Sequence, residues 1–233
     1  MKASTSPAND SNLIATLAAG VAHEVRNPLN SLQINLSILE QELSELLPGR
    51  ENHVFAVLAK IAGEIKRLDD FVSEFLRFAR APRPNVERLA VGPLLTDLAG
   101  FITPECSEKG GRLEVELDGP ESAWVDGFQL KQAVLNLVLN ALQASPAGGH
   151  VVVRTSGDKR RLVVSVSDDG EGMSPETRAK AFTPFFTTRE EGTGLGLALV
   201  HRIVDQHGGS VDILSAPGRG TTVTLVFPAP RGA

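Results

Sequence analysis

The sequence contains no tyrosine and only one tryptophan, two methionines and one cysteine. The single cysteine, Cys106, rules out an intrachain disulfide and a cysteine metal cluster, which favours a reducing compartment such as the cytoplasm. No apolar run approaches the roughly 18 residues that span a bilayer. The N-terminus also lacks a basic region followed by an apolar one, as a secretion signal would have. We therefore expect a soluble chain.

The charge pattern also excludes a class of partner. The formal net charge is -5, and the positive residues are scattered along the chain without clustering, so nucleic acid is not an expected partner. The 233 residues are 42% hydrophobic, which is ample for a buried core. The length allows one large domain, or a helical module together with one domain of ordinary size, and we favour the second arrangement.

The first module is predicted to be a helical hairpin. Two stretches place apolar residues at alternating steps of three and four, which is typical of helices that pack as coiled coils. "LPGRE" separates the two stretches and "RAPRPNVER" ends the second. The apolar positions are Ala15, Ala18, Ala22, Val25, Leu29, Leu32, Leu36, Leu39, Leu43 and Leu46, then Val54, Leu58, Ile61, Ile65, Leu68, Val72 and Phe75. Two helices alone cannot bury these stripes, so we expect a homodimeric four-helix bundle.

The second module has a different pattern and begins after a linker marked by Pro82 and Pro84. Residues 113–117, 150–156, 161–169 and 221–228 are predicted strands, and residues 132–144 and 195–206 are predicted helices. This order indicates an α+β fold, an α/β layer sandwich with helices on one face of a mixed sheet. Such a fold alone does not identify a function.

Two asparagines of "QAVLNLVLNAL" lie on one helical face. Asn136 and Asn140 are four residues apart, and amide oxygens suit Mg²⁺ without adding negative charge beside a polyphosphate. Taken by themselves, they could equally be ordinary surface amides.

Asp168, in "SDDGEGM", ends a predicted strand and is followed by Gly170 and Gly172. Glycines allow the backbone to approach a flat ligand closely, and the carboxylate can accept a hydrogen bond from an exocyclic amine such as that of adenine. Asp-Gly is also common in tight turns that have no further function.

The segment "FTPFFTTREEGTGLGLALV" leads from a phenylalanine cluster through three glycines directly into a helix. Glycines at a helix N-terminus form a cradle for an anion. The segment is neither a P-loop nor a dinucleotide fingerprint. A flexible glycine linker would explain neither the phenylalanines nor the helix.

The ordered motifs resemble those of sensor histidine kinases and of the wider GHKL superfamily of ATP-binding proteins. "QAVLNLVLNAL", "DDGEGM", "FTPFF", "GTGLGL" and "GRGTTVTL" resemble the N, G1, F, G2 and G3 boxes, and "HEVRNPL" resembles the H-box. The resemblance implies a disordered N-terminus over residues 1–11 and a dimerisation and histidine-phosphotransfer hairpin over 12–80. A linker over 81–90 and a catalytic ATP-binding domain of the Bergerat (GHKL) type over 91–229 would follow.

The H-box residues would then carry the phosphoryl chemistry. The resemblance implies that His23 accepts the γ-phosphoryl group of ATP and passes it to an aspartate of a response regulator receiver domain. Glu24 would act as the general base. Asn27 lies one helical turn from His23, and an H-E-x-x-N arrangement implies phosphatase activity toward the regulator as well. Pro28 is expected to kink the helix.

The resemblance also assigns the nucleotide site. Asn140, supported by Asn136, would bind Mg²⁺, Asp168 would bind the adenine amine, and residues 182–191 would form a lid over the nucleotide. The full set expected at the nucleotide is Asn136, Asn140, Asp168, Gly170, Gly172, Thr188, Gly192, Thr193, Gly194, Leu195, Gly196 and Thr221. Arg189 occupies a position where the family often has lysine, which keeps the charge and changes its geometry.

Two alternatives stay open at this point. A GHKL ATPase without kinase activity would lack the His-Glu helix, and a silent scaffold that only docks a regulator would not need the intact asparagine, aspartate and glycine motifs. No sensor domain is expected, so the chain is either an excised core or receives its input from another protein.

Overall fold

The computed structural model describes residues 25, 29–39, 41, 43, 51–80, 82–108, 110–189 and 192–229. It separates into two compact units, Met1–Ala81 and Pro82–Ala233, each of which is described by itself. Within the described ranges, no helix is both long and apolar enough to cross a membrane.

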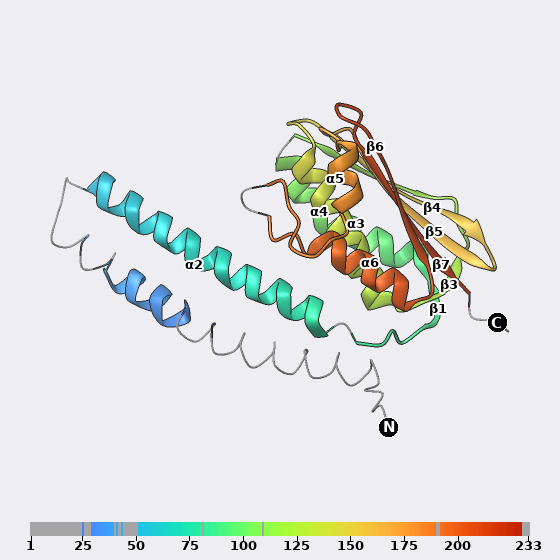
Figure 1. The fold of residues 1–233 in the computed structure, drawn as a ribbon, viewed down its shortest axis with the longest axis horizontal. Helices are drawn as coiled ribbons and strands as arrows, with labels where there is room; N and C mark the ends of the chain where they lie inside the picture. Colours follow the sequence, from blue (N-terminus) through green and yellow to red (C-terminus); the bar gives the residue numbers. More distant parts are fainter. Residues whose placement is uncertain are drawn as a thin grey trace, which may run out of the picture. The chain divides into compact units, whose positions relative to one another are not determined.

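The first unit is helical, as predicted (Figure 1). Val25 and residues 29–39, 41 and 43 are helical, and helix α2 spans Glu51–Arg80. Leu58, Ile65 and Val72, at intervals of seven residues along α2, are buried. Ile61 and Leu68, the alternate members of the same seam, remain 44% and 49% exposed. One side of the apolar seam of α2 is therefore buried and the other side is accessible.

The second unit contains a mixed five-stranded sheet, and its elements follow one another in a fixed order. They are β1 (Glu87–Ala90), α3 (Val91–Glu108), β2 (Arg112–Leu117), β3 (Ser122–Val125), α4 (Gly127–Ala144), β4 (His150–Asp158), β5 (Arg161–Asp168), α5 (Pro175–Lys180), α6 (Gly196–Gln206), β6 (Ser210–Ser215) and β7 (Thr221–Pro228). The sheet order is β2-β4-β5-β7-β6, in which β2 and β4 are parallel and the other pairs are antiparallel. Strands β1 and β3 form a separate antiparallel pair.

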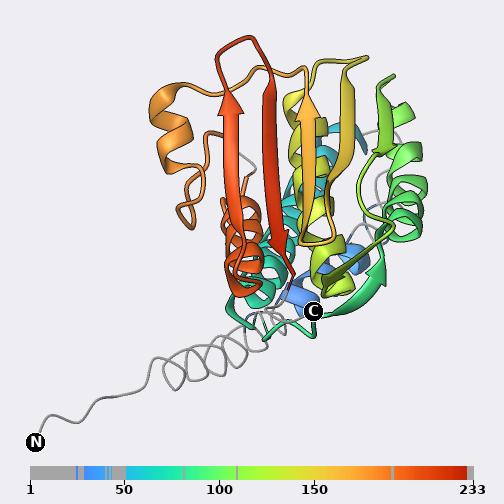
Figure 2. The same ribbon diagram turned by 90° about the vertical axis from the view of Figure 1, so that its right-hand side faces the viewer.

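Helices α3, α4 and α6 cover one face of the sheet, and Figure 2 shows the other face toward the viewer. The alternation of side chains along the strands creates this layering. On β7, Val223, Leu225 and Phe227 are buried while the residues between them are partly exposed. Buried residues of α4 and α6, such as Leu130 and Ile203, complete the core. The predicted α/β sandwich with a mixed sheet is confirmed.

Helix α4 begins at Gly127, five residues before the predicted start at Gln132. Asp126 is its N-cap, and the Asp126 Oδ1 accepts a hydrogen bond from the Gln129 N–H at 3.0 Å. An acceptor at this position satisfies one of the free N–H groups of the first turn. The short strands β1 and β3 were not predicted, because four residues are too few to show an alternating pattern.

The segment that precedes β1 is attached to the N-terminal end of helix α4. The Gln129 side-chain Nε2 donates a hydrogen bond to the Pro82 carbonyl at 3.0 Å, and the Asn85 N–H donates to Asp126 Oδ2 at 2.8 Å. His207 completes the anchor, because its Nε2 accepts a hydrogen bond from the Asp126 N–H at 3.2 Å. From Pro82 onward, the chain is therefore attached by hydrogen bonds to the rest of the second unit.

Candidate functional site

The second half of helix α4 presents two unpaired amides. Asn136 and Asn140 are half-buried on one face of the helix. Neither side chain has a hydrogen-bond partner within the part of the chain that the structure describes. A half-buried amide with no protein partner is available to a ligand or a cation.

Asp168 is the last residue of β5, and backbone donors hold its carboxylate in place. Oδ1 accepts hydrogen bonds from the N–H groups of Gly170 at 2.9 Å and Thr221 at 3.2 Å. Oδ2 has no partner among the described residues. Burial raises the pKa of Asp168 above its usual value, and the two backbone hydrogen bonds oppose that rise. The free oxygen of this fixed carboxylate can accept a hydrogen bond from a ligand.

The loop after β5 packs against the turn between β6 and β7. The Gly220 N–H donates to the Gly170 carbonyl at 3.0 Å, and the Gly218 N–H donates to the Glu171 carbonyl at 2.7 Å. A Cβ atom on Gly172 would overlap the Ala216 carbonyl oxygen, and one on Gly220 would overlap the Asp168 carbonyl oxygen. The two glycines thus allow these backbones to touch and fix the position of Asp168.

The predicted lid segment folds back on the start of α6. The Phe185 N–H donates to the Gly194 carbonyl at 3.0 Å, and Phe185 has the left-handed φ of 66°. Because a Cβ atom on Gly194 would lie 2.5 Å from the Phe185 carbonyl carbon, this contact requires glycine. Such strain in a bulky residue is typical of functional loops.

Helix α6 begins at Gly196 without a side-chain cap at its N-cap residue, Leu195. The first N–H groups of a helix have no partner inside the helix. This end of α6 therefore has the features of the predicted anion cradle.

The structure locates most of the residues that the sequence assigns to the nucleotide. Thr221 is buried, and its hydroxyl pairs with the Ser215 hydroxyl at 2.9 Å. Leu195 is fully buried, whereas Thr188 is exposed. The predicted phosphoryl-transfer residues His23, Glu24 and Asn27 lie outside the described residues.

Two contributors were not predicted from the sequence. Ser215 accepts a hydrogen bond from the Met173 N–H at 2.8 Å and donates one to the Gly220 carbonyl at 3.0 Å, so it joins the two loops that hold Asp168. Gln143 contacts Arg189 of the lid. Neither residue belongs to a glycine or asparagine motif, and both act through contacts between distant parts of the chain.

The donor set suits one kind of cation. No group of three or more histidine, cysteine, aspartate or glutamate side chains in the described ranges could hold a metal ion. The two neutral amides of α4 remain as oxygen ligands, which hard cations such as Mg²⁺ accept.

Comparison with known proteins assigns both parts of the chain. The family described as "Histidine kinase-, DNA gyrase B-, and HSP90-like ATPase" matches residues 125–231. The family described as "His Kinase A (phospho-acceptor) domain" matches residues 14–84.

Named relatives agree with these matches. Sensor histidine kinase ZraS of Escherichia coli (strain K12) is 38% identical over 215 residues, which cover 91% of this chain and 45% of that protein. Sporulation kinase D of Bacillus subtilis (strain 168) is 35% identical over 234 residues, or 98% of this chain and 44% of that protein. The crystal structure of full-length ShkA in complex with AMPPNP superposes with a TM-score of 0.73 at 27% identity, covering 92% of this chain and 46% of that one.

The chain thus spans less than half the length of these relatives. Its helical unit matches the phospho-acceptor domain, and its α/β unit matches the ATPase domain. The chain belongs to the histidine kinase family and comprises a histidine kinase catalytic core.

Proposed function

We propose that this chain phosphorylates itself on His23 with ATP and then transfers the phosphoryl group to an aspartate of a response regulator. The observation that carries the proposal is the fixed Asp168 carboxylate with one free oxygen, together with the unpaired amides of Asn136 and Asn140. The match of a phospho-acceptor domain to residues 14–84, which include His23, supports it. The AMPPNP bound to ShkA supports a nucleotide as the ligand.

Different residues of the site are proposed to bind the adenine base and the phosphates. The free Oδ2 of Asp168 accepts a hydrogen bond from the adenine amine, and the first turn of α6 donates to phosphate oxygens. Asn140, supported by Asn136, would hold Mg²⁺, which neutralises phosphate charge when it is bound. Glu24 takes the imidazole proton so that His23 can attack the γ-phosphorus atom while ADP leaves. We also propose a cytoplasmic location, because the one cysteine of the chain is free and a reducing compartment suits a free thiol.

Substituting His23 tests the kinase activity directly. Incubating the wild type with γ-labelled ATP and Mg²⁺ is expected to give protein-bound label that is labile in acid and stable in alkali. His23→Ala is expected to lose all of this label, because no second acceptor in the sequence lies in an H-box. His53→Ala, a matched change in the helical unit, is expected to keep it. Nucleotide binding without any label would indicate the ATPase alternative, and absence of nucleotide binding would indicate the scaffold.

We further propose a phosphatase activity that depends on Asn27. Its support is the spacing of four residues between His23 and Asn27 in "HEVRN". Asn27→Ala is expected to slow the dephosphorylation of a phosphorylated receiver domain at least about tenfold, since it removes the side chain proposed to position the attacking water. Autophosphorylation of His23 should persist in this variant. An unchanged dephosphorylation rate would remove Asn27 from this role.

We also propose that the chain is a homodimer through its helical unit. Ile61 and Leu68 leave an accessible apolar stripe on α2, which a second copy would bury. The double variant Ile61→Lys and Leu68→Lys is expected to be monomeric in light scattering at micromolar concentration, because two charges would be buried in the dimer. Lys66→Ala, at an exposed position between them, should stay dimeric. A wild-type protein that is monomeric at high concentration would refute the dimer.

A further inference from the structure

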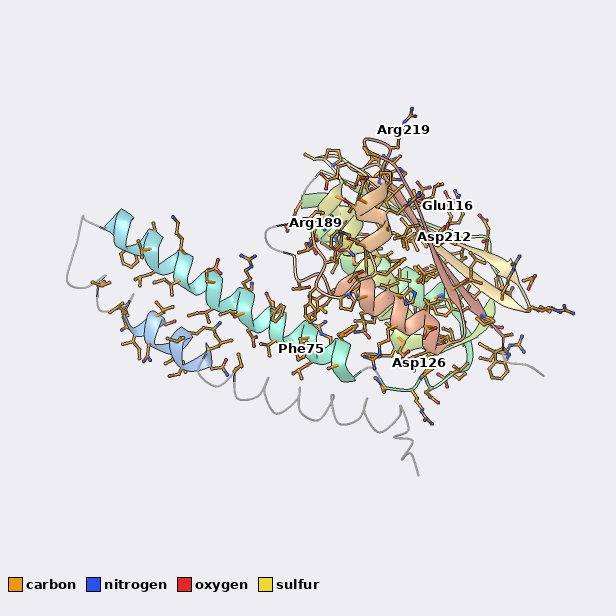
Figure 3. The ribbon with its side chains drawn as sticks, viewed as in Figure 1. Phe75, Glu116, Asp126, Arg189, Asp212 and Arg219 are labelled. Carbon is orange, nitrogen blue, oxygen red and sulfur yellow. The ribbon has the colours of Figure 1, made fainter. Side chains whose placement is uncertain are left out.

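The side chain of Arg189 connects the lid to helix α4. Its Nη1 donates a hydrogen bond to the Gln143 Oε1 at 2.7 Å, and its Nη2 donates to the Asn140 carbonyl at 3.2 Å. Figure 3 shows Arg189 and the α4 N-cap Asp126 well apart. The guanidinium is therefore bound beside the amides of the site, on the C-terminal half of α4.

The local fold of the lid presents Arg189 in this position. Thr187 Oγ1 accepts a hydrogen bond from the Arg189 N–H at 3.1 Å, and the Gly192 N–H donates to the Arg189 carbonyl at 3.3 Å. A Cβ atom on Gly192 would overlap Thr187 Oγ1. Gly192 thus allows the turn that presents Arg189.

The charge of Arg189 also acts on the site. The guanidinium favours the ionised form of Asp168 and so lowers the pKa of that carboxyl, against the larger effect of burial. Among the described residues, Gln143 is the side chain that pairs with this guanidinium. Only two of its N–H groups are used, and the remaining N–H groups have no partner within the described part of the chain.

We propose that Gln143 is a positioning residue, which holds the guanidinium of Arg189 beside Asn140 so that its remaining N–H groups bind the phosphate oxygens of the nucleotide. This inference rests on the proposed function, because it needs a nucleotide in the site. A guanidinium fixed before binding loses less conformational entropy when phosphate arrives. Gln143 therefore contributes to phosphate binding through Arg189 and leaves adenine binding unaffected.

The test compares a nucleotide with a nucleoside on the full chain. The dissociation constants of AMPPNP with Mg²⁺ and of adenosine are measured by calorimetry for the wild type, Gln143→Leu, Arg189→Ala and the double variant. Leucine keeps the approximate size of the side chain and removes the acceptor. Gln143→Leu is expected to weaken AMPPNP binding about three- to tenfold, as for one partly exposed hydrogen bond to a charged group, and to leave adenosine binding within about twofold. In the Arg189→Ala background, the Gln143 change should have no further effect.

A second measurement needs no ligand. Hydrogen exchange in lid residues 185–189 and in the following residues 192–195 is expected to be faster in Gln143→Leu and in Arg189→Ala than in the wild type. It should be no faster in the double variant than in Arg189→Ala. Lys131→Ala, an exposed change on the same helix, should alter neither exchange nor affinity.

Each alternative outcome has a distinct meaning. The positioning role would be overturned if Gln143→Leu weakened the binding of AMPPNP and of adenosine equally. It would also be overturned if Gln143→Leu weakened AMPPNP binding as much in the Arg189→Ala background as in the wild type. Unchanged AMPPNP affinity would also overturn it. If the wild type bound neither ligand, the proposed function itself would fail and the phosphate role with it, while lid exchange would still decide whether Gln143 holds Arg189.

Discussion

Replacing Asp168 with asparagine is expected to weaken ATP binding about 10- to 100-fold while the fold stays intact. The loss follows from exchanging a charged acceptor for an amide donor that opposes the adenine amine, and hydrogen bonds to charged groups contribute about 1.5–3 kcal/mol. The fold should persist because the asparagine oxygen can still accept the hydrogen bonds from Gly170 and Thr221 that Asp168 Oδ1 accepts now. Calorimetric titration with ATP and Mg²⁺ measures the change.

Inosine triphosphate provides the control for this variant. Inosine carries a carbonyl oxygen where adenosine carries the amine, so the wild-type carboxylate should bind it poorly and the asparagine variant should bind it better than it binds ATP. A variant that loses both nucleotides equally, with unchanged thermal unfolding, would show that Asp168 does not contact the base.

Gly220→Ala is expected to reduce the free energy of unfolding by about 2–5 kcal/mol. Gly220 has a φ of 68°, which costs an L-residue about 1–2 kcal/mol. Its added Cβ would also overlap the Asp168 carbonyl oxygen, and accommodating such an overlap by backbone movement costs typically about 1–3 kcal/mol more. Denaturant unfolding followed by circular dichroism measures the loss, and nucleotide affinity should fall with it because Asp168 would be displaced.

Gly218→Ala separates the two effects within the same turn. Gly218 has the same φ of 68°, but a Cβ atom added there would have no neighbouring atom within 4 Å. Its substitution should therefore cost only about 1–2 kcal/mol from the backbone conformation. Equal losses at the two positions would mean that the contact between this turn and Asp168 is not tight in solution.

Much of the sheet was predictable because its strands alternate clearly. Strand β7 has the predicted limits, and β5 ends one residue before the predicted end. Strand β6 and helix α3 were not predicted. In β6 the apolar and polar residues do not alternate clearly in the sequence, because two apolar residues, buried Ile213 and exposed Leu214, are adjacent. Helix α3 contains Pro104, a residue that normally argues against a helix interior.

The candidate site was predictable in part, for a related reason. Asp168 and the two asparagines each lie in a short motif within or next to a single helix or strand. Local spacing in the sequence was therefore enough to indicate them. The contact between Gln143 and Arg189 joins residues 46 positions apart, and no local pattern encodes such a distance. The same holds for Ser215, whose partners come from two different loops.

The attachment of the chain at Pro82 shortens the segment that joins helix α2 to the α/β unit. Helix α2 ends at Arg80, and among the described residues the first hydrogen bond to the ATP-binding unit is made at Pro82. A tether of two residues spans at most about 7 Å, whereas a free linker of ten residues would span about 35 Å. A short tether confines the two groups that it links to a small volume, and so it raises the effective concentration of one around the other. The hydrogen bond from Gln129 therefore sets the length of the covalent connection through which the reactants of the proposed autophosphorylation, ATP and His23, would meet.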